Sequence, residues 1–224
     1  MLASRSPRRQ DAMKALGLAF DVAVSDVELT LPPGEDPCDP VPVAVAKVVD
    51  VARTASNSAQ VLGADTIVVD GTRPIGKPVD AEDAVTMLMG LRGRTHRVRT
   101  GVALYERGRL VTFEVASPVQ MRDYDRDVAQ RYVATGQALD CAGSYDARSA
   151  GELLIAGIDG CMSAVIGFPV GAVVRVLRQE TGHTGLTDGI PACEVLCGAP
   201  CRARNAATAK ACDASLFTRR TFFA

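Results

Sequence analysis

The chain has 224 residues, of which 47% are hydrophobic and 23% charged, a composition typical of a folded globular protein rather than a disordered one. The length suits one large domain or two small lobes. A formal net charge of −1 and an aromatic content of 4% argue against a basic or base-stacking surface, so we expect no nucleic-acid partner. No run of about 18 apolar residues and no apolar leader occur, so we expect no membrane association and a cytoplasmic location.

The first half of the chain alternates helix and strand signals. A capping serine, a proline at the first helical position and a closing glycine predict a helix over residues 6–17. Alternating apolar residues predict a half-buried strand over 18–25. A helical stripe follows over 39–51, and the nearly continuous apolar run 61–69 predicts a strand buried on both faces.

The second half continues this alternation. Apolar stripes predict helices at residues 80–91, 125–135 and 169–180. Apolar alternation and short apolar runs predict strands at 96–104, 110–121, 153–158 and 164–166, the first two as a hairpin. Helices interleaved with strands, together with a hairpin, indicate an α/β domain with a mixed sheet and flanking helices.

The chain divides by composition near its C-terminal end. Residues 1–182 carry the periodic segments and are predicted to form the folded domain, whereas 183–224 are expected to be a mobile C-terminal extension. Seven cysteines without a secretion signal favour reduced thiols. Cys193, Cys197 and Cys201 could share a helix face, but their spacing is not typical of zinc sites, which favours incidental thiols.

The first candidate site is the segment Ser4-Arg-Ser-Pro-Arg-Arg9. It places hydroxyls and two consecutive cations at the start of a helix, where free N–H groups and the helix dipole favour an anion. Arginine holds phosphate oxygens with two parallel bonds. The alternative is a simple helix cap followed by solvated arginines.

The second candidate is Asp65, a carboxylate inside an apolar strand. An unpartnered buried carboxylate is costly, so Asp65 is expected to be hydrogen-bonded, salt-bridged or placed at a cleft facing a metal or water. Glu28, Lys47 and Lys77 add the carboxylate and cations that metal-assisted attack on a phosphoanhydride requires. Each of these residues taken alone also fits an ordinary surface position.

Other catalytic patterns find no support. The two histidines, His96 and His183, occur without a G-x-S-x-G elbow, and the chain contains neither a Walker A loop nor a dinucleotide-binding glycine fingerprint. His96 is therefore interpreted as a strand residue whose ring finds hydrogen-bond partners in the core.

Six segments in order along the chain match a known pattern: residues 2–9, 25–28, 61–66, 76–78, 93–101 and 166–169. Together they resemble the Maf family of nucleoside triphosphate pyrophosphatases over about residues 1–180. The resemblance implies a long mixed sheet with two lobes around a cleft, and hydrolysis of the α–β phosphoanhydride of nucleotides with a divalent metal cation (Mg or Mn). It also implies a possible homodimer.

The resemblance further implies roles for individual residues. Asp65 matches the catalytic carboxylate and, with Glu28, would hold the metal. The other cleft positions match Ser4, Arg8, Arg9, Glu28, Lys47 and Lys77. Positions linked to base choice match Arg8, Thr66 and Arg148.

The segment Asp140–Tyr145 leaves the substrate open. Its Cys-Ala-Gly-Ser core resembles members that cleave 7-methyl-GTP, whereas the Gly-Ala-Asp-Thr segment around Asp65 resembles the dTTP- and UTP-cleaving type. Arg148 offers only hydrogen-bond donors, which favours bases that present acceptors, such as uracil, thymine or unmodified guanine. This ranks a pyrimidine triphosphate such as UTP or dTTP above 7-methyl-GTP. A catalytically degenerate, nucleotide-binding or division-linked member is the alternative from a different class.

Overall fold

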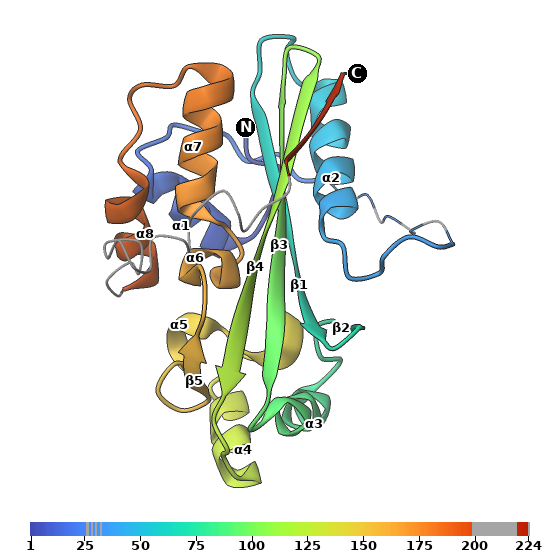
Figure 1. The fold of residues 1–224 in the computed structure, drawn as a ribbon, viewed down its shortest axis with the longest axis vertical. Helices are drawn as coiled ribbons and strands as arrows, with labels where there is room; N and C mark the ends of the chain where they lie inside the picture. The colour runs from blue at the N-terminus through green and yellow to red at the C-terminus, as the bar shows by residue number, and fades with distance from the viewer. Residues whose placement is uncertain (26, 28, 30, 32, 199–218, 224) are drawn as a thin grey trace.

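The structure is a computed structural model that describes every residue except 26, 28, 30, 32, 199–218 and 224, and that describes only the backbone of 219–223. A long antiparallel hairpin runs along the molecule as its spine (Figure 1). Its strands are β3 (Thr95–Glu106) and β4 (Arg109–Met121). Arg107 and Gly108 between them have positive φ values of 49° and 78°, as a two-residue turn between twisted strands requires.

The sheet has the order β2–β1–β3–β4–β5, and β6 shares with β5 the edge of β4 that faces away from β3. The other strands are β1 (Val61–Asp70), β2 (Arg73–Ile75), β5 (Ile155–Ile158) and β6 (Arg219–Phe223). All pairings between these strands are antiparallel, and parallel bridges join Leu2 to Val22 and to Leu62. The predicted α/β fold with an elongated sheet is confirmed, with its parallel component limited to these bridges.

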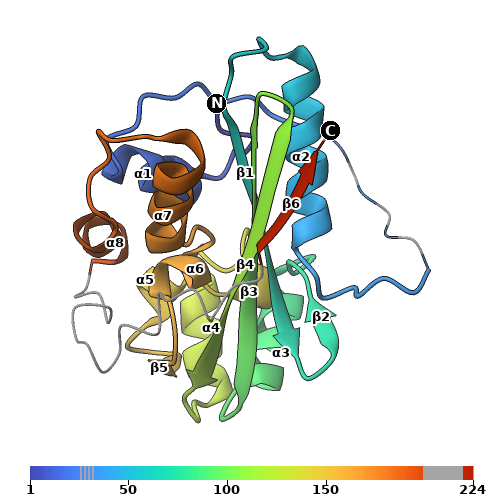
Figure 2. The same ribbon diagram turned by 45° about the horizontal axis from the view of Figure 1, so that its top comes forward.

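Helices divide the molecule into two lobes along the sheet (Figures 1 and 2). One face of the upper lobe carries α1 (Pro7–Ala15), α6 (Met162–Ile166), α7 (Val170–Thr181) and α8 (Gly189–Cys197), and the opposite face carries α2 (Val41–Thr54). The lower lobe contains α3 (Ala81–Leu91), α4 (Arg126–Ala134), the 3₁₀ turn η1 (Ala142–Ser144) and α5 (Ala147–Ala150). No described helix has the length and hydrophobicity that a membrane crossing requires.

Each lobe has its own buried cluster of apolar side chains. The upper lobe is filled from one face by residues that include Leu16, Phe113 and Phe168, with a smaller cluster under α2. The lower lobe is filled by residues that include Leu88 and Tyr132. The two clusters are distinct, and Met162 of α6 packs against both of them where the lobes meet.

The helix α2 packs unusually close to the sheet. A Cβ atom placed on Gly101 of β3 would lie 2.7 Å from the backbone nitrogen of Val41, and one placed on Gly63 of β1 would lie 2.6 Å from Val48. Gly101 is the direct cross-strand partner of Asp65, so its missing side chain makes room for the first turn of α2 beside that carboxylate. This close approach sets the position of Lys47 on α2 relative to the sheet.

Two strand predictions are wrong. Residues 18–25 contribute a single bridge at Val22 rather than a strand. Residues 164–166 lie in the short helix α6, which ends at Gly167 with a φ of 109°. A short apolar run does not separate a buried strand from a buried helix, because both present apolar side chains all round. β1 is also not buried on both faces throughout, since Asp65 to Ile67 are half-buried.

The predicted domain boundary at residue 182 remains a prediction, but the first part of the extension packs on the domain. α8 contacts α1, α6 and α7, and four apolar side chains around it join the upper-lobe core: Leu186, Ala192, Cys193 and Leu196. The mobility expected for 183–224 also remains a prediction, although residues 186–197 pack on the domain. The sequence does not predict α8 because the helix is short and its cysteines do not form a strong apolar stripe.

The close packing of α2 predicts that Gly101→Ala destabilises the protein. The added Cβ would meet backbone atoms that cannot rotate away, so α2 must shift, at a cost of about 1–3 kcal/mol. Thermal unfolding monitored by circular dichroism checks this. Gly90→Ala is the control, because a Cβ at Gly90 on α3 has open space around it and should leave the midpoint unchanged or slightly higher.

The packing of α8 predicts that Leu196→Ala lowers the free energy of unfolding by about 2 kcal/mol or more, since it opens a cavity in the upper-lobe core. The adjacent Val195 is 75% exposed, so Val195→Ala should change the free energy of unfolding by less than about 0.5 kcal/mol. Denaturant unfolding of both variants is the measurement. Equal midpoints for the two would contradict the packing of α8.

Candidate active site

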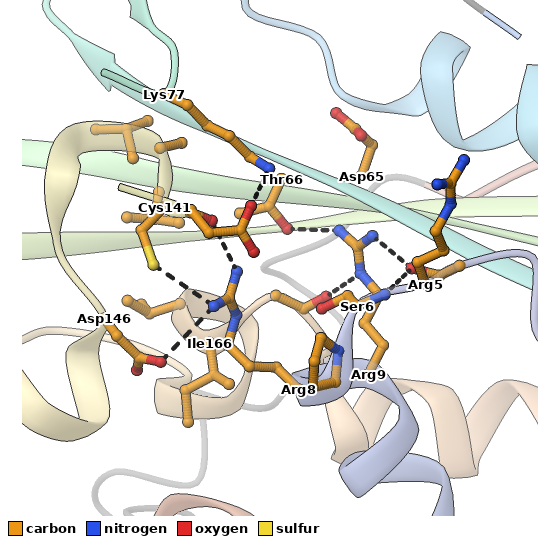
Figure 3. Close-up of a pocket in the computed structure, with 18 of the residues that line it drawn as sticks. Arg5, Ser6, Arg8, Arg9, Asp65, Thr66, Lys77, Cys141, Asp146 and Ile166 are labelled. Carbon is orange, nitrogen blue, oxygen red and sulfur yellow. Dashed lines mark hydrogen bonds and ion pairs between the residues drawn. The ribbon is translucent and has the colours of Figure 1, made fainter. Parts of the chain in front are cut away.

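A cavity of about 540 Å³ lies in the cleft between the two lobes (Figure 3). The cavity lies at the edge of β1 that faces away from β3. On this edge, Leu62 is bridged by Leu2 and pairing with β2 begins at Val68, and no described strand pairs with the residues between them. Its rim is formed by residues 3–9 of the upper lobe and 140–147 of the lower lobe. Side chains from both faces of β1, Asp65 and Thr66, therefore reach the same cavity.

The charges around this cavity are mainly positive. Five cationic side chains line it, and three carboxylates face them; the cations are Arg5, Arg8, Arg9, Lys47 and Lys77, and the carboxylates are Asp65, Asp140 and Asp146. The first turn of α1 adds few backbone donors, because Pro7 has no N–H and the N–H groups of Arg9 and Gln10 donate to the carbonyl oxygen of Ser6. The wall as a whole thus favours an anion with several negative charges.

Arg9 is held in place by three hydrogen bonds. Its Nε donates to the carbonyl oxygen of Gly167 (3.0 Å), its Nη1 to Ser4 Oγ (3.1 Å) and its Nη2 to Thr66 Oγ1 (3.2 Å). Ser4 Oγ also accepts from the backbone nitrogen of Ser6 at 3.3 Å, at the N-terminal cap of α1. Arg9 therefore joins α1, β1 and the end of α6 at one point.

The Thr66 hydroxyl extends this network across the sheet. Thr66 Oγ1 lies 3.0 Å from Thr100 Oγ1 of β3, which donates to the carbonyl oxygen of Ala164 at 2.8 Å. Because Thr100 donates its only hydroxyl proton to the carbonyl oxygen of Ala164, the Thr66 hydroxyl must donate to Thr100 and accept from Arg9. The direction of every bond is thereby determined, and the guanidinium of Arg9 lies at the donor end.

Arg9 remains charged despite its burial. Burial lowers its pKa from the ordinary range to about 10; the Asp65 carboxylate opposes that shift and Arg8 adds to it. A pKa near 10 leaves the guanidinium protonated at neutral pH. Three of its five N–H donors serve protein acceptors, so Arg9 offers a ligand its charge, the rigidity it gives the wall and at most two further donors.

Asp65 forms an ion pair with Lys47. Lys47 Nζ on α2 donates to Asp65 Oδ1 at 2.6 Å, and the two side chains are 24% and 23% exposed. The carboxylate thus satisfies two of the predicted possibilities, since it is salt-bridged and also faces a cleft. Asp65 is partly exposed and lines the cavity, where a carboxylate can accept a proton or ligate a cation.

Arg8 and Lys77 connect the rim of the cavity to the lower lobe. Arg8 Nη1 lies 3.5 Å from Cys141 Sγ and 3.8 Å from Asp146 Oδ2, and its Nη2 donates to the carbonyl oxygen of Asp140 at 3.4 Å (Figure 3). Lys77 forms an ion pair with the Asp140 carboxylate. Burial raises the pKa of the Cys141 thiol, so Cys141 meets Arg8 as a neutral acceptor.

Arg148 is not among the residues that line the cavity. It pairs with Asp146, with Nη2 3.0 Å from Oδ2, and lies 3.9 Å from Asp11 on α1. Burial opposes ionisation of Asp146, but the hydrogen bonds from Arg148 and the charge of Arg8 outweigh it and hold the pKa of this carboxyl below its usual range. Asp146 therefore separates the two arginines as a shared anion.

Most of the predicted site residues come together in this cavity: Ser4, Arg8, Arg9, Lys47, Asp65, Thr66 and Lys77. Glu28 lies outside the described residues. Sequence reasoning missed Asp140, Asp146 and Tyr145 as lining residues. Asp140 precedes the turn η1, and Tyr145 and Asp146 follow it. The only signal for them in the sequence was the segment Asp140–Tyr145, which was considered for substrate choice and not for individual contacts.

A metal ion would find few protein ligands in the described residues. No group of three or more His, Cys, Asp or Glu side chains there is arranged to hold one. Cys193 and Cys197 place their sulfurs 3.7 Å apart on α8, whereas Cys201 lies outside the described part of the chain. Of the three cavity carboxylates, Asp65 is the one that lies on the sheet, and a single carboxylate suits a magnesium-like ion that takes its other ligands from a bound phosphate and water.

Together, the sheet, the paired lobes and the cationic cleft define a two-lobed α/β protein with a single sheet carboxylate at the cleft. The chain belongs to the Maf family, because the family model described as Maf-like protein matches residues 1–180. It is 38% identical over 182 residues to a dTTP/UTP pyrophosphatase of Desulforamulus reducens, an alignment that covers 80% of this chain and 95% of the relative. It is 41% identical over 180 residues to a dTTP/UTP pyrophosphatase of Bacillus cytotoxicus, with 80% and 94% covered.

The hydrogen bonds of Arg9 predict that Arg9→Lys destabilises the protein by about 1–3 kcal/mol, because a single ammonium group cannot replace the fork that serves three separated acceptors. Arg53→Lys is the control, since Arg53 is exposed in the last turn of α2. Thermal unfolding and calorimetric binding of inorganic pyrophosphate are the measurements. Unchanged stability and affinity in Arg9→Lys would contradict the assigned role.

Proposed function

We propose that this protein hydrolyses nucleoside triphosphates between the α and β phosphorus atoms, releasing a nucleoside monophosphate and pyrophosphate. The observation that carries the proposal is Asp65, a cleft carboxylate held by Lys47 within a wall of cations. The names of the two relatives, both dTTP/UTP pyrophosphatases, support the same reaction class.

The triphosphate is proposed to lie along the cationic rim. Arg8 at the start of α1, Lys47 and Lys77 approach it from three separate elements, and Ser4 supports the rim through Arg9. These cations offset the roughly four negative charges of the nucleotide and the negative charge that develops on the leaving pyrophosphate. Lys77 must exchange its partner Asp140 for a phosphate oxygen, which its exposed position at the rim permits.

Asp65 is proposed as the base. Its carboxylate accepts a proton from a water molecule whose oxygen attacks the α phosphorus, and the bond from that phosphorus to the bridging oxygen breaks to release pyrophosphate. Lys47 keeps the carboxylate oriented, with its Nζ 2.6 Å from Asp65 Oδ1. The proposal gives Asp65 a role that needs its negative charge, not only its shape.

A divalent cation such as Mg²⁺ or Mn²⁺ is proposed as the cofactor. Asp65 would supply the protein ligand found in the described residues, and Glu28, which lies outside them, is the second proposed ligand. When bound, the ion would neutralise phosphate charge and polarise the phosphorus centre. Magnesium commonly binds through one or two carboxylates plus substrate phosphates, which fits this sparse set of protein ligands.

A pyrimidine triphosphate, dTTP or UTP, is the proposed substrate class. The relatives' names favour it over 7-methyl-GTP, despite the Cys-Ala-Gly-Ser sequence at residues 141–144. Arg148 is proposed to affect base choice only indirectly, because its guanidinium is paired with Asp146 and Arg148 does not line the cavity. Thr66 and Arg8 remain the proposed direct contacts on that side.

The proposed base predicts that Asp65→Asn loses at least about a hundredfold in kcat, the lower range for a positioned acid–base group. Pyrophosphate release from dTTP, UTP and 7-methyl-GTP with Mg²⁺ or Mn²⁺ is the measurement, together with the thermal midpoint. The matched control is Asp127→Asn, an exposed carboxylate on α4 away from the cavity, which should leave turnover unchanged. A folded Asp65→Asn variant with near-normal turnover would remove Asp65 from the mechanism.

A further inference from the structure

Among the buried polar residues that the structure describes, His96 stands out because one of its ring nitrogens is unpaired. His96 of β3 is 2% exposed, and its Nε2 lies 2.6 Å from the hydroxyl of Tyr145. Its Nδ1 has no hydrogen-bond partner in the described structure. Buried unsatisfied groups of this kind are uncommon in native proteins and call for a reason. The interpretation of His96 as a fully satisfied core residue is therefore only half right.

The direction of the hydrogen bond follows from the donors available. Burial lowers the pKa of His96 to about 4, so the ring is neutral and carries one proton. If Nε2 carried it, both the Nδ1 lone pair and the Tyr145 hydroxyl proton would lack partners. If Nδ1 carries it, only that N–H is unsatisfied, and Tyr145 donates to Nε2. The second arrangement leaves fewer unpaired groups, so His96 acts as an acceptor for Tyr145.

Tyr145 directly follows a strained turn. Ser144 has a φ of 63°, a left-handed conformation that costs a non-glycine residue roughly 1 kcal/mol or more. Three contacts hold the turn: the backbone nitrogen of Gly143 donates to the Gly76 carbonyl (3.0 Å), Ser144 Oγ contacts Met87 Sδ (3.2 Å), and Tyr145 reaches His96. Such strain persists only where the surroundings hold it in place.

This turn forms the lower wall of the cavity. Cys141, Ala142, Tyr145, Asp146 and Ala147 all line it. Apolar side chains from both lobes continue that wall: Val68, Val98 and Val165. Arg8 and Lys77 contact the turn at Asp140, Cys141 and Asp146. The three valines nevertheless offer an apolar stretch of wall, which suits the nucleoside end of a nucleotide.

We propose that His96 is a positioning residue that sets the nucleoside-binding wall of this cavity by accepting the Tyr145 hydroxyl beneath the turn at 141–147. The inference rests on the proposed function for the identity of the ligand. His96 touches neither Asp65 nor Lys47, so its effect falls on nucleotide affinity rather than on the chemical step. The unsatisfied Nδ1–H is the energetic cost of placing an acceptor at this buried point.

The test is a set of substitutions at both ends of the bond. His96→Phe and Tyr145→Phe are each expected to raise KM for UTP or dTTP about tenfold, the equivalent of one buried hydrogen bond, with kcat within about threefold of the parent. The double variant should be no worse than either single one, because both remove the same bond. His96→Gln, whose side-chain oxygen can still accept from Tyr145, should recover most of the affinity.

Tyr124→Phe is the matched control. Tyr124 is also buried in the lower-lobe core and donates to the Leu88 carbonyl at 2.7 Å, but it does not line the cavity. Its variant should lower the thermal midpoint and leave KM unchanged. If His96→Phe and Tyr145→Phe only lower the midpoint as Tyr124→Phe does, His96 is structural and the inference is overturned.

Calorimetric binding of an α,β-methylene UTP analogue, which cannot be cleaved at the proposed bond, separates this inference from the proposed function. A wild-type protein that binds the analogue but releases no pyrophosphate from UTP overturns the proposed function. In that case, a tenfold weaker binding in His96→Phe still supports the role of His96. Equal binding in wild type and His96→Phe overturns the inference while leaving the proposed reaction intact, and a wild type that binds no analogue overturns both.

Discussion

The ion pair between Lys47 and Asp65 is the interaction on which the site depends. A carboxylate in the middle of β1 needs a cationic partner, since an unpaired charge at a partly buried position costs several kcal/mol. The partner comes from α2, and α2 reaches it because Gly63 and Gly101 offer no side chain to hold the helix away. The two glycines, the helix and the ion pair thus form one arrangement, in which a change in any part moves the charge at the cleft.

The uncovered edge of β1 gives this arrangement its access to a ligand. Successive residues of a strand point to opposite faces of the sheet. Asp65 and Thr66 can nevertheless line one cavity, because no described strand pairs with the outer edge of β1 at these two residues. The upper lobe brings the start of α1 to this edge, and the lower lobe brings the turn that Tyr145 and His96 support. The cavity is therefore assembled from one element of the sheet and the facing ends of both lobes.

Predictions from the sequence succeed where a pattern is long. The helices around residues 7–15, 41–54 and 170–181 and the β3–β4 hairpin were all predicted, because an apolar period repeated over several turns or pairs is a strong signal. The short segments failed: 164–166 is helical, and α8 was not anticipated. Among the candidate residues, the cavity contains all the described ones except Arg148, and it adds Asp140, Tyr145 and Asp146.

The sequence by itself determined the chemistry available to this protein: a carboxylate within an apolar strand, cations at a helix start and on a second helix, and the family to which the chain belongs. Local pattern carries that information because burial and capping act within a few residues of the chain. Only the tertiary structure decided which groups meet. The pairing of Lys47 with Asp65, the turning of Arg148 onto Asp146 and the contact between His96 and Tyr145 join residues 18, 2 and 49 positions apart. Arg148 shows that even a near neighbour can redirect a side chain, because the half-buried carboxylate of Asp146 pairs with its guanidinium at the edge of the cavity.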